Sequence, residues 1–337
     1  MNRDNSHHAY DWLVLGGDIG GTSTRILVAA NDGTPIGRGT AGGGNPVSHP
    51  DTAAESLASA LRDALTDIAP ARVRTSVVGV AGGSALRQSD VRSAFDEVWI
   101  AAGLTCTPRY VSDLEVAFAS GTSETDGTLL IAGTGAVAGA VRDRRLVKTA
   151  DGHGWLLGDD GSGFWLGREA ARATLRALDE AEAIGPLAES VLRALGVGDA
   201  DIRSTRQPEL GHWRMHVIHS LNKRPPVRLA ELAPLVTQAS AAGDPSAEAI
   251  VAAAVELLSE TVGRVRQRYE HTPIVLAGRL AQADSPVGAR LRTRIAERFS
   301  GAILSAQDGV GGAAWLALAT VDPLAATAEA RSRLIAT

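Results

Sequence analysis

Cysteine and lysine are scarce in this chain of 337 residues, which contains one cysteine, Cys106, and two lysines among 33 basic residues. A single cysteine excludes an intramolecular disulfide, a four-cysteine zinc site and a self-contained iron–sulfur cluster. Neither Lys148 nor Lys223 lies in the pattern G-x-x-x-x-G-K-[ST]. The chain is therefore not a P-loop NTPase.

Long apolar segments and basic clusters are also missing. The longest uncharged apolar stretch, Gly309 to Val321, is too short to span a bilayer. The polar N-terminal residues lack the apolar core of a signal peptide. The net charge is −5, and no basic stripe indicates nucleic acid or an anionic membrane surface as a partner. We expect a cytoplasmic protein that binds neither nucleic acid nor membrane.

Glycine, in contrast, is abundant, with 37 residues in 337, or about 11% against an average near 7%. Two glycine-rich loops stand at matching places in a pattern of elements that occurs twice, offset by roughly 110 residues. Each copy begins with three short strands, and a loop joins the first two. The first copy is expected as strands 13–17, 24–30 and 36–40, a helix capped by Asp51 and running to 68, strand 73–81, helix 89–102, strand 108–112 and a helix from 114. The second is expected as strands 129–132, 136–141 and 146–149, long helices, strand 273–277, helix 286–299, strand 303–305 and a helix from 311.

This βββαβαβα order, repeated, predicts an α/β protein of two lobes joined by a hinge. The first lobe is expected at residues 1–120, completed by the C-terminal helix at about 315–337. The second is expected at 121–314, with a helical insertion at about 168–270.

The two glycine loops are candidate phosphate-binding loops, because bare main-chain amides and hydroxyl groups can donate to phosphate oxygens. Asp18, in the first loop, could hold a hydrated Mg²⁺ ion through water, since Mg²⁺ keeps most of its waters. The residues expected to bind the phosphates of a nucleotide are Gly20, Gly21, Thr22, Ser23, Gly133, Thr134 and Gly135.

The second loop also matches a different motif. Residues 133–138 fit the dinucleotide fingerprint G-x-G-x-x-[GA], with Asp151 about 18 residues further on. That fingerprint requires a helix after the loop. Residues 136–141 alternate small and apolar side chains and end at a turn, which predicts a strand. A nicotinamide-dependent dehydrogenase is therefore disfavoured.

The duplicated pattern resembles the actin-like, ribonuclease H-like ATPase fold. Within it, the chain is similar to the N-acetylglucosamine kinase branch of the BadF/BadG/BcrA/BcrD ATPase family over residues 13–320. The motifs that carry this resemblance are GDIGGTST at 17–24, Gly44-Asn45, Ser112-Asp113, LIAGTG at 130–135, GWLLGDDGSG at 154–163, Ala277-Gly278 and GVGGA at 309–313.

The resemblance implies that phosphates bind between the two glycine loops and that a sugar lies in a cleft between the lobes. It implies Asp113 as the general base, although Ser112-Asp113 also fits a plain helix cap. It further implies sugar contacts from Asn45, Gly135, His153 and Asp159, besides Asp113 itself. Adenosine is expected against Gly278 and Arg279.

Two departures from the family pattern bear on specificity. The second loop continues as Ala136-Val137, where relatives carry side chains near the N-acetyl group, and Arg279 stands where a further glycine is common. The expected activity is an ATP- and Mg²⁺-dependent transfer of the γ-phosphoryl group to the 6-hydroxyl of N-acetylglucosamine. Glucosamine or another hexose remains open as substrate, as do a non-catalytic actin-like ATPase module and a homodimer.

Overall fold

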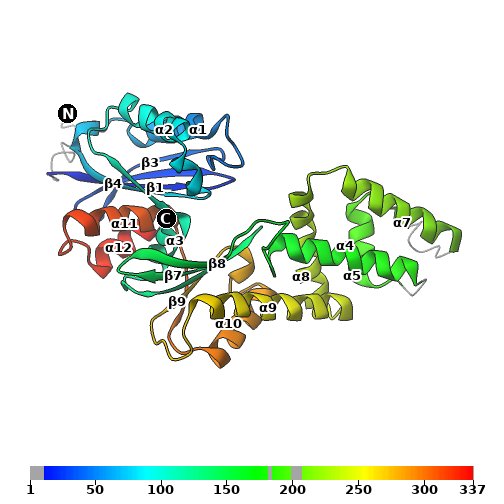
Figure 1. Cartoon of the computed structure of the whole chain (residues 1–337). Coiled ribbons are helices and arrows are strands. Elements are labelled where there is room, and N and C mark those ends of the chain that lie inside the picture. Colours follow the sequence, from blue (N-terminus) through cyan, green and yellow to red (C-terminus); the bar gives the residue numbers. More distant parts are fainter. Residues whose placement is uncertain (1–10, 181–183, 199–206, 337) are drawn as a thin grey trace, which may run out of the picture. The chain divides into compact units, whose positions relative to one another are not determined.

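The computed structural model describes residues 11–180, 184–198 and 207–336 (Figure 1). Parts of the expected first lobe (residues 1–10 and 337) and of the expected insertion (181–183 and 199–206) lie outside the described residues. The chain divides into two compact units. Unit 1 takes the chain up to Asp126, the segment Val141–Leu146 and everything from Ala306 onward, and unit 2 takes Gly127–Ala140 and Val147–Ser305.

Unit 1 is built on a mixed five-stranded sheet in the order β3-β2-β1-β4-β5. Its strands are β1 (Leu13–Ile19), β2 (Thr24–Ala30), β3 (Pro35–Ala41), β4 (Val73–Val80) and β5 (Pro108–Ser112). The first three form an antiparallel meander, and β4 and β5 add in parallel to β1. Because both faces of the sheet are covered, its central strands are apolar at nearly every position.

The helices of unit 1 cover the two faces separately. Leu13 and Leu15 point to the face packed by α1 (Ala53–Ala64) and α2 (Ser89–Ala101). Val14 points to the opposite face, covered by α3 (Asp113–Gly121), α11 (Gly309–Val321) and α12 (Ala328–Ile335). Short 3₁₀ helices, η2 (Pro70–Arg72) and η3 (Gly83–Arg87), flank β4.

Unit 2 repeats this plan with a sheet in the order β10-β9-β6-β7-β8. Its strands are β6 (Gly127–Ala132), β7 (Ala136–Arg142), β8 (Arg145–Asp151), β9 (Ile274–Ala277) and β10 (Ile303–Ser305). Its helices are α4 (Gly163–Asp179), α5 (Pro186–Ala194), α7 (Gln207–Asn222), η4 (Pro226–Leu232), α8 (Ala233–Ala241), α9 (Pro245–Val265), η5 (Arg279–Ala281) and α10 (Pro286–Arg298).

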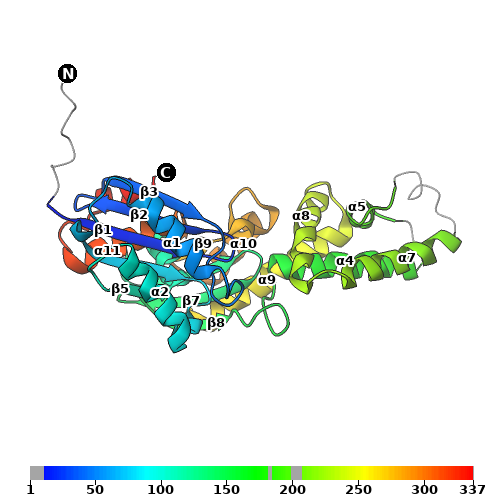
Figure 2. The ribbon, with the colours of Figure 1, turned by 90° about the horizontal axis from the view of Figure 1, so that it is seen from above.

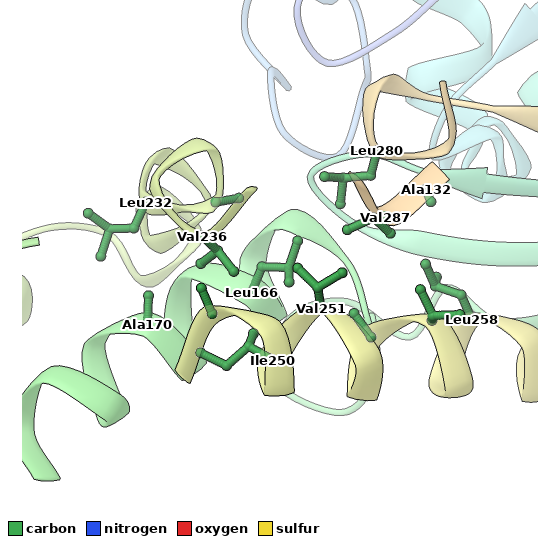
Figure 3. Packing of buried hydrophobic residues seen from close by; sticks show 14 of the residues in the cluster. Ala132, Leu166, Ala170, Leu232, Val236, Ile250, Val251, Leu258, Leu280 and Val287 are labelled. Carbon is green, nitrogen blue, oxygen red and sulfur yellow. The ribbon is translucent and has the colours of Figure 1, made fainter. Parts of the chain in front are cut away.

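One continuous core ties these helices to the sheet of unit 2. Leu166 of α4, Val236 of α8 and Val251 of α9 meet in it (Figure 3). The helices α4, α5 and α7 gather at the end of unit 2 away from its sheet (Figure 2). Among the described residues, no helix combines the length and apolarity needed to cross a bilayer.

The predicted order of elements is confirmed in both copies, and most boundaries agree within two residues. The predicted cap of the first helix is wrong. The helix begins at Ala53 with Thr52 at the N-cap, and no side chain caps it.

Candidate active site

The carboxyl ends of three parallel strands bring the candidate residues of unit 1 to one edge of its sheet. Ile19 at the end of β1 pairs with Val80 of β4, and Val80 pairs with Ser112 of β5. The glycine loop after Ile19 and the carboxylate of Asp113 therefore follow neighbouring strand ends. This is the edge at which open α/β sheets bind their ligands.

The first glycine loop is closed by its own main chain. The amide of Gly20 donates to the carbonyl of Ser23 at 2.8 Å, and the Gly20 carbonyl accepts from the amides of Gly44 and Asn45 at 3.0 and 3.1 Å. Gly21 and Thr22 are exposed. These hydrogen bonds hold the loop in one conformation, with main-chain amides and a hydroxyl group exposed to solvent.

Asp18 lies at the start of this loop in an ion-pair network. Arg25 donates to Oδ2 of Asp18 at 2.5 Å and to Asp308 at 2.9 Å. Burial is the main cause that raises the pKa of Asp18, and the charge of Arg25 opposes it. Oδ1 makes no hydrogen bond to the described residues. One free carboxylate oxygen fits a hydrated Mg²⁺ ion, which needs few protein ligands, and no cluster of three metal-ligating side chains exists in the described ranges.

Asp113 is the first residue of α3, and one of its carboxylate oxygens accepts a hydrogen bond at the start of the helix. The amide of Leu114 donates both to Oγ of Ser112 at 3.2 Å and to Oδ1 of Asp113 at 3.1 Å. The N-cap is Ser112, so the cap does not depend on Asp113 alone. Burial raises the pKa of Asp113, and the negative charge of Asp18 raises it further. A carboxylate with a raised pKa is a stronger base.

Asn45 uses its side-chain oxygen locally. Oδ1 accepts from the amides of Val47 at 2.8 Å and Ser48 at 3.3 Å. A Cβ atom on Gly82, after β4, would lie 2.6 Å from the same oxygen. This arrangement fixes the side chain beside the β4 edge and leaves its NH₂ group to donate to a ligand.

In unit 2, the second glycine loop is built around Asp159. The amide of Gly133 donates to the carbonyl of Gly135 at 2.9 Å, which closes the turn. The amide of Ala136 donates to Oδ1 of Asp159 at 3.1 Å. A Cβ atom on Gly135 would lie 2.8 Å from that oxygen. Glycine is needed at 135 because the carboxylate occupies the space of a side chain.

Asp151 is buried and fixes the loop that carries Asp159. The sequence did not indicate that it positions this loop. The carboxylate of Asp151 accepts from the amides of Asp159 at 2.7 Å and Asp160 at 3.0 Å. Neither Asp159 nor Asp160 caps the following helix, since Ser162 is the N-cap of α4. The exposed residue His153 is close enough for its charge to oppose the burial that raises the pKa of Asp159.

A cavity of about 470 Å³ opens beside the second loop. Gly133, Thr134 and Arg279 line it, which brings three of the sequence-predicted nucleotide residues together. Gly278 has φ +86°, and a Cβ there would lie 2.4 Å from the carbonyl of Ala132. Glycine is therefore required at 278 because the main chain of β6 leaves no room for a side chain. The volume is in the range of pockets for nucleotide-sized ligands.

Another part of the cavity wall comes from the helical insertion. The sequence did not predict that these residues line a site. It consists of Ala230, Ala233, Pro234, Thr237 and Gln238, from η4 and α8. These are ordinary residue types with no motif, so nothing in the sequence marked them.

The duplicated sheets, each with a glycine loop after its first strand, define a protein of the actin-like ATPase class. The profile of the BadF/BadG/BcrA/BcrD ATPase family matches residues 15–317. The chain belongs to this family.

The chain is also similar to individual kinases over most of its length. An N-acetyl-D-glucosamine kinase of Dictyostelium discoideum is 24% identical over 326 residues, covering 91% of this chain and 98% of the relative. The structure of a candidate N-acetylglucosamine kinase from Chromobacterium violaceum superposes with a TM-score of 0.66 at 24% identity, covering 90% and 98% of the two chains. A ROK-family glucokinase from Streptomyces griseus, solved with glucose and AMPPNP, gives 0.51 at 17% identity, covering 90% and 99%.

Proposed function

We propose that this protein is an ATP- and Mg²⁺-dependent kinase that phosphorylates the 6-hydroxyl of N-acetylglucosamine, with Asp113 as general base. The position and environment of Asp113 carry the proposal. It follows a parallel strand at the ligand-binding edge, its Oδ2 makes no hydrogen bond to the described residues, and burial raises its pKa. Such a carboxylate can accept the proton of a sugar hydroxyl as the phosphoryl group transfers.

The sugar would be held by groups whose geometry is already fixed. In the proposal, the NH₂ group of Asn45 donates to one hydroxyl and the carboxylate of Asp159 accepts from another. Both side chains are anchored by main-chain amides, so little conformational entropy is lost when the sugar binds. His153 and Gly135 complete the proposed contacts.

The nucleotide would place its adenosine in the 470 Å³ cavity and its phosphates at Gly133 and Thr134. Gly20, Gly21, Thr22 and Ser23 of the first loop are the proposed phosphate donors of unit 1. In this proposal the bound Mg²⁺ would neutralise phosphate charge, and Asp18 would hold it through water.

One observation favours a second candidate substrate. Ala136 is buried, and a Cβ on Gly152 would lie 2.9 Å from the Val137 side chain. Both side chains are hydrocarbons, so neither can hydrogen-bond to an N-acetyl group. This supports glucosamine or another hexose as an alternative acceptor for the same chemistry.

The Asp113→Asn variant tests the proposal. Asparagine keeps an Oδ1 acceptor for Leu114 but cannot take a proton, so kcat should fall by about 10²- to 10⁴-fold. A matched control is Asp322→Asn, because Oδ1 of Asp322 also accepts from the main chain, from the amides of Leu324 and Ala325. We expect the control to keep wild-type turnover. Near-wild-type turnover of Asp113→Asn would reduce Asp113 to a helix cap and overturn the proposed role.

A further inference from the structure

A small hollow in unit 1 gathers three arginines outside the candidate active site. It has a volume of about 160 Å³ and is lined by Arg109 of β5, Arg144 of the turn before β8, Arg145 at the start of β8, and the C-terminal end of α11. The N-terminal end of α11 packs Gly309 against Asp18. At 1.5 Å per residue, the lining residues of α11, Leu316 to Thr320, lie about 10 to 16 Å along the helix from that contact.

Hydrogen-bond donors around this hollow lack acceptors. Nε of Arg109 and Nε of Arg144 are buried and have no hydrogen-bond partner among the described residues. The guanidinium of Arg144 lies 5.0 Å from the ring centre of Trp315, whose buried Nε1 also has no partner there. Native proteins rarely leave a buried donor unpaired. Two of these donors belong to side chains that line the hollow, Arg109 and Arg144, so an acceptor with several lone pairs would suit it.

The charge balance of the hollow is also incomplete. Burial lowers the pKa of Arg109, the negative charge of Glu115 opposes this, and the positive charge of Arg145 adds a smaller lowering. None of the three arginines forms a salt bridge within the described part of the chain. The acidic neighbours are Asp143, which lines the hollow, Asp126, which accepts from the amide of Asp143 at 2.8 Å, and Glu115, which accepts from the amide of Leu146 at 2.7 Å. Among the residues that line the hollow, three positive charges face the one negative charge of Asp143.

We propose that this hollow is a binding site for a phosphate-sized oxyanion, supplied as inorganic phosphate or as the phosphoryl group of a phosphate monoester. A tetrahedral oxyanion offers several acceptors to guanidinium groups that donate in parallel pairs. The volume is below the range of pockets that enclose drug-sized ligands. Only the anionic group would be enclosed, and the remainder of a monoester would extend into solvent.

Calorimetric titration of the full chain with inorganic phosphate at constant ionic strength tests the site. We expect saturable binding that weakens about tenfold in Arg109→Gln and in Arg145→Gln, since each removes one charge-assisted contact. The matched control is Arg62→Gln, which makes the same charge change on α1, at the opposite face of the sheet. It should bind like wild type. Arg145 is exposed, so its variant should fold normally, which circular dichroism checks.

Parallel titrations with glucose 6-phosphate and with glucose distinguish the two sources of the anion. Tighter binding of glucose 6-phosphate than of phosphate, lost in Arg145→Gln, identifies a monoester site, and equal binding identifies an inorganic phosphate site. No saturable binding of either probe would overturn the proposal. Equal affinity in all four proteins would place the anion elsewhere and overturn it as well.

Discussion

The carboxylate of Asp151 accepts a hydrogen bond of 2.7 Å from the main-chain amide of Asp159, while its other oxygen holds the amide of Asp160. Asp151 and Asp159 both have positive φ, +61° and +58°. These contacts hold the loop in a conformation that residues other than glycine adopt rarely. Asp151 is thus a positioning residue for the proposed sugar-binding carboxylate.

Replacing Asp151 by asparagine should loosen this loop. An NH₂ group would replace one of the two acceptors and leave a loop amide unpaired, which costs about 1–3 kcal/mol. We expect the KM for the sugar to rise more than kcat falls. Sugar titration and chemical denaturation check both effects. A variant with unchanged sugar affinity would contradict the positioning role.

The two glycines of the second loop should respond differently to an added methyl group. At Gly135 the methyl would lie 2.8 Å from the Asp159 carboxylate, whereas at Gly133 nothing lies within 4 Å. Gly135→Ala should therefore weaken sugar binding and lower stability. Gly133→Ala should fold like wild type but bind ATP at least about tenfold more weakly, because the methyl meets the phosphates.

Separate titrations with sugar and nucleotide, together with melting curves, distinguish the two glycine variants. Normal ATP affinity in Gly133→Ala would show that the loop does not approach the phosphates.

The strands and the glycine loops were predictable because their causes are local. Buried strands require apolar runs, and the glycine-rich loops that follow β1 and β6 stand out in the sequence at matching places. The role of Asp151 was not predictable, because its partners lie eight and nine residues away across a loop whose conformation the sequence does not reveal. Thr237 and Gln238 were missed for a similar reason, since only tertiary packing brings α8 to the cavity.

Asp113 should make the protein less stable at neutral pH than an uncharged side chain would. Its folded pKa is raised by burial, so its contribution to stability is fully present below the unfolded pKa. That contribution is lost as pH rises through the folded pKa. Asp113→Asn should therefore unfold at higher denaturant concentration than wild type at pH 7. The difference should shrink in acid, where wild type is protonated in both states.

The Asp113→Asn substitution should therefore raise the stability of the protein while it lowers the activity. A variant less stable than wild type at pH 7 would mean that hydrogen bonds to the carboxylate outweigh its burial. The buried-base account would then be wrong.

Gln238 of α8 lines the cavity and should contribute to nucleotide binding. Gln238→Leu keeps the approximate size of the side chain but removes its hydrogen-bonding groups. We expect ATP affinity to fall about 3- to 10-fold with sugar affinity unchanged, measured by titration with a fluorescent ATP analogue. Gln267→Leu is the control, because Gln267 is exposed and does not line the cavity. Equal affinities in both variants would exclude Gln238 from the nucleotide site.

The most direct test of the proposed kinase activity is a coupled ADP-release assay over N-acetylglucosamine, glucosamine, N-acetylmannosamine and glucose, with ³¹P NMR of the product. The account predicts ADP release that requires both Mg²⁺ and a hexose, with the highest kcat/KM on N-acetylglucosamine and the phosphate on its 6-oxygen. A higher kcat/KM on glucosamine would favour the alternative substrate. Absence of turnover on all four sugars would contradict the kinase assignment.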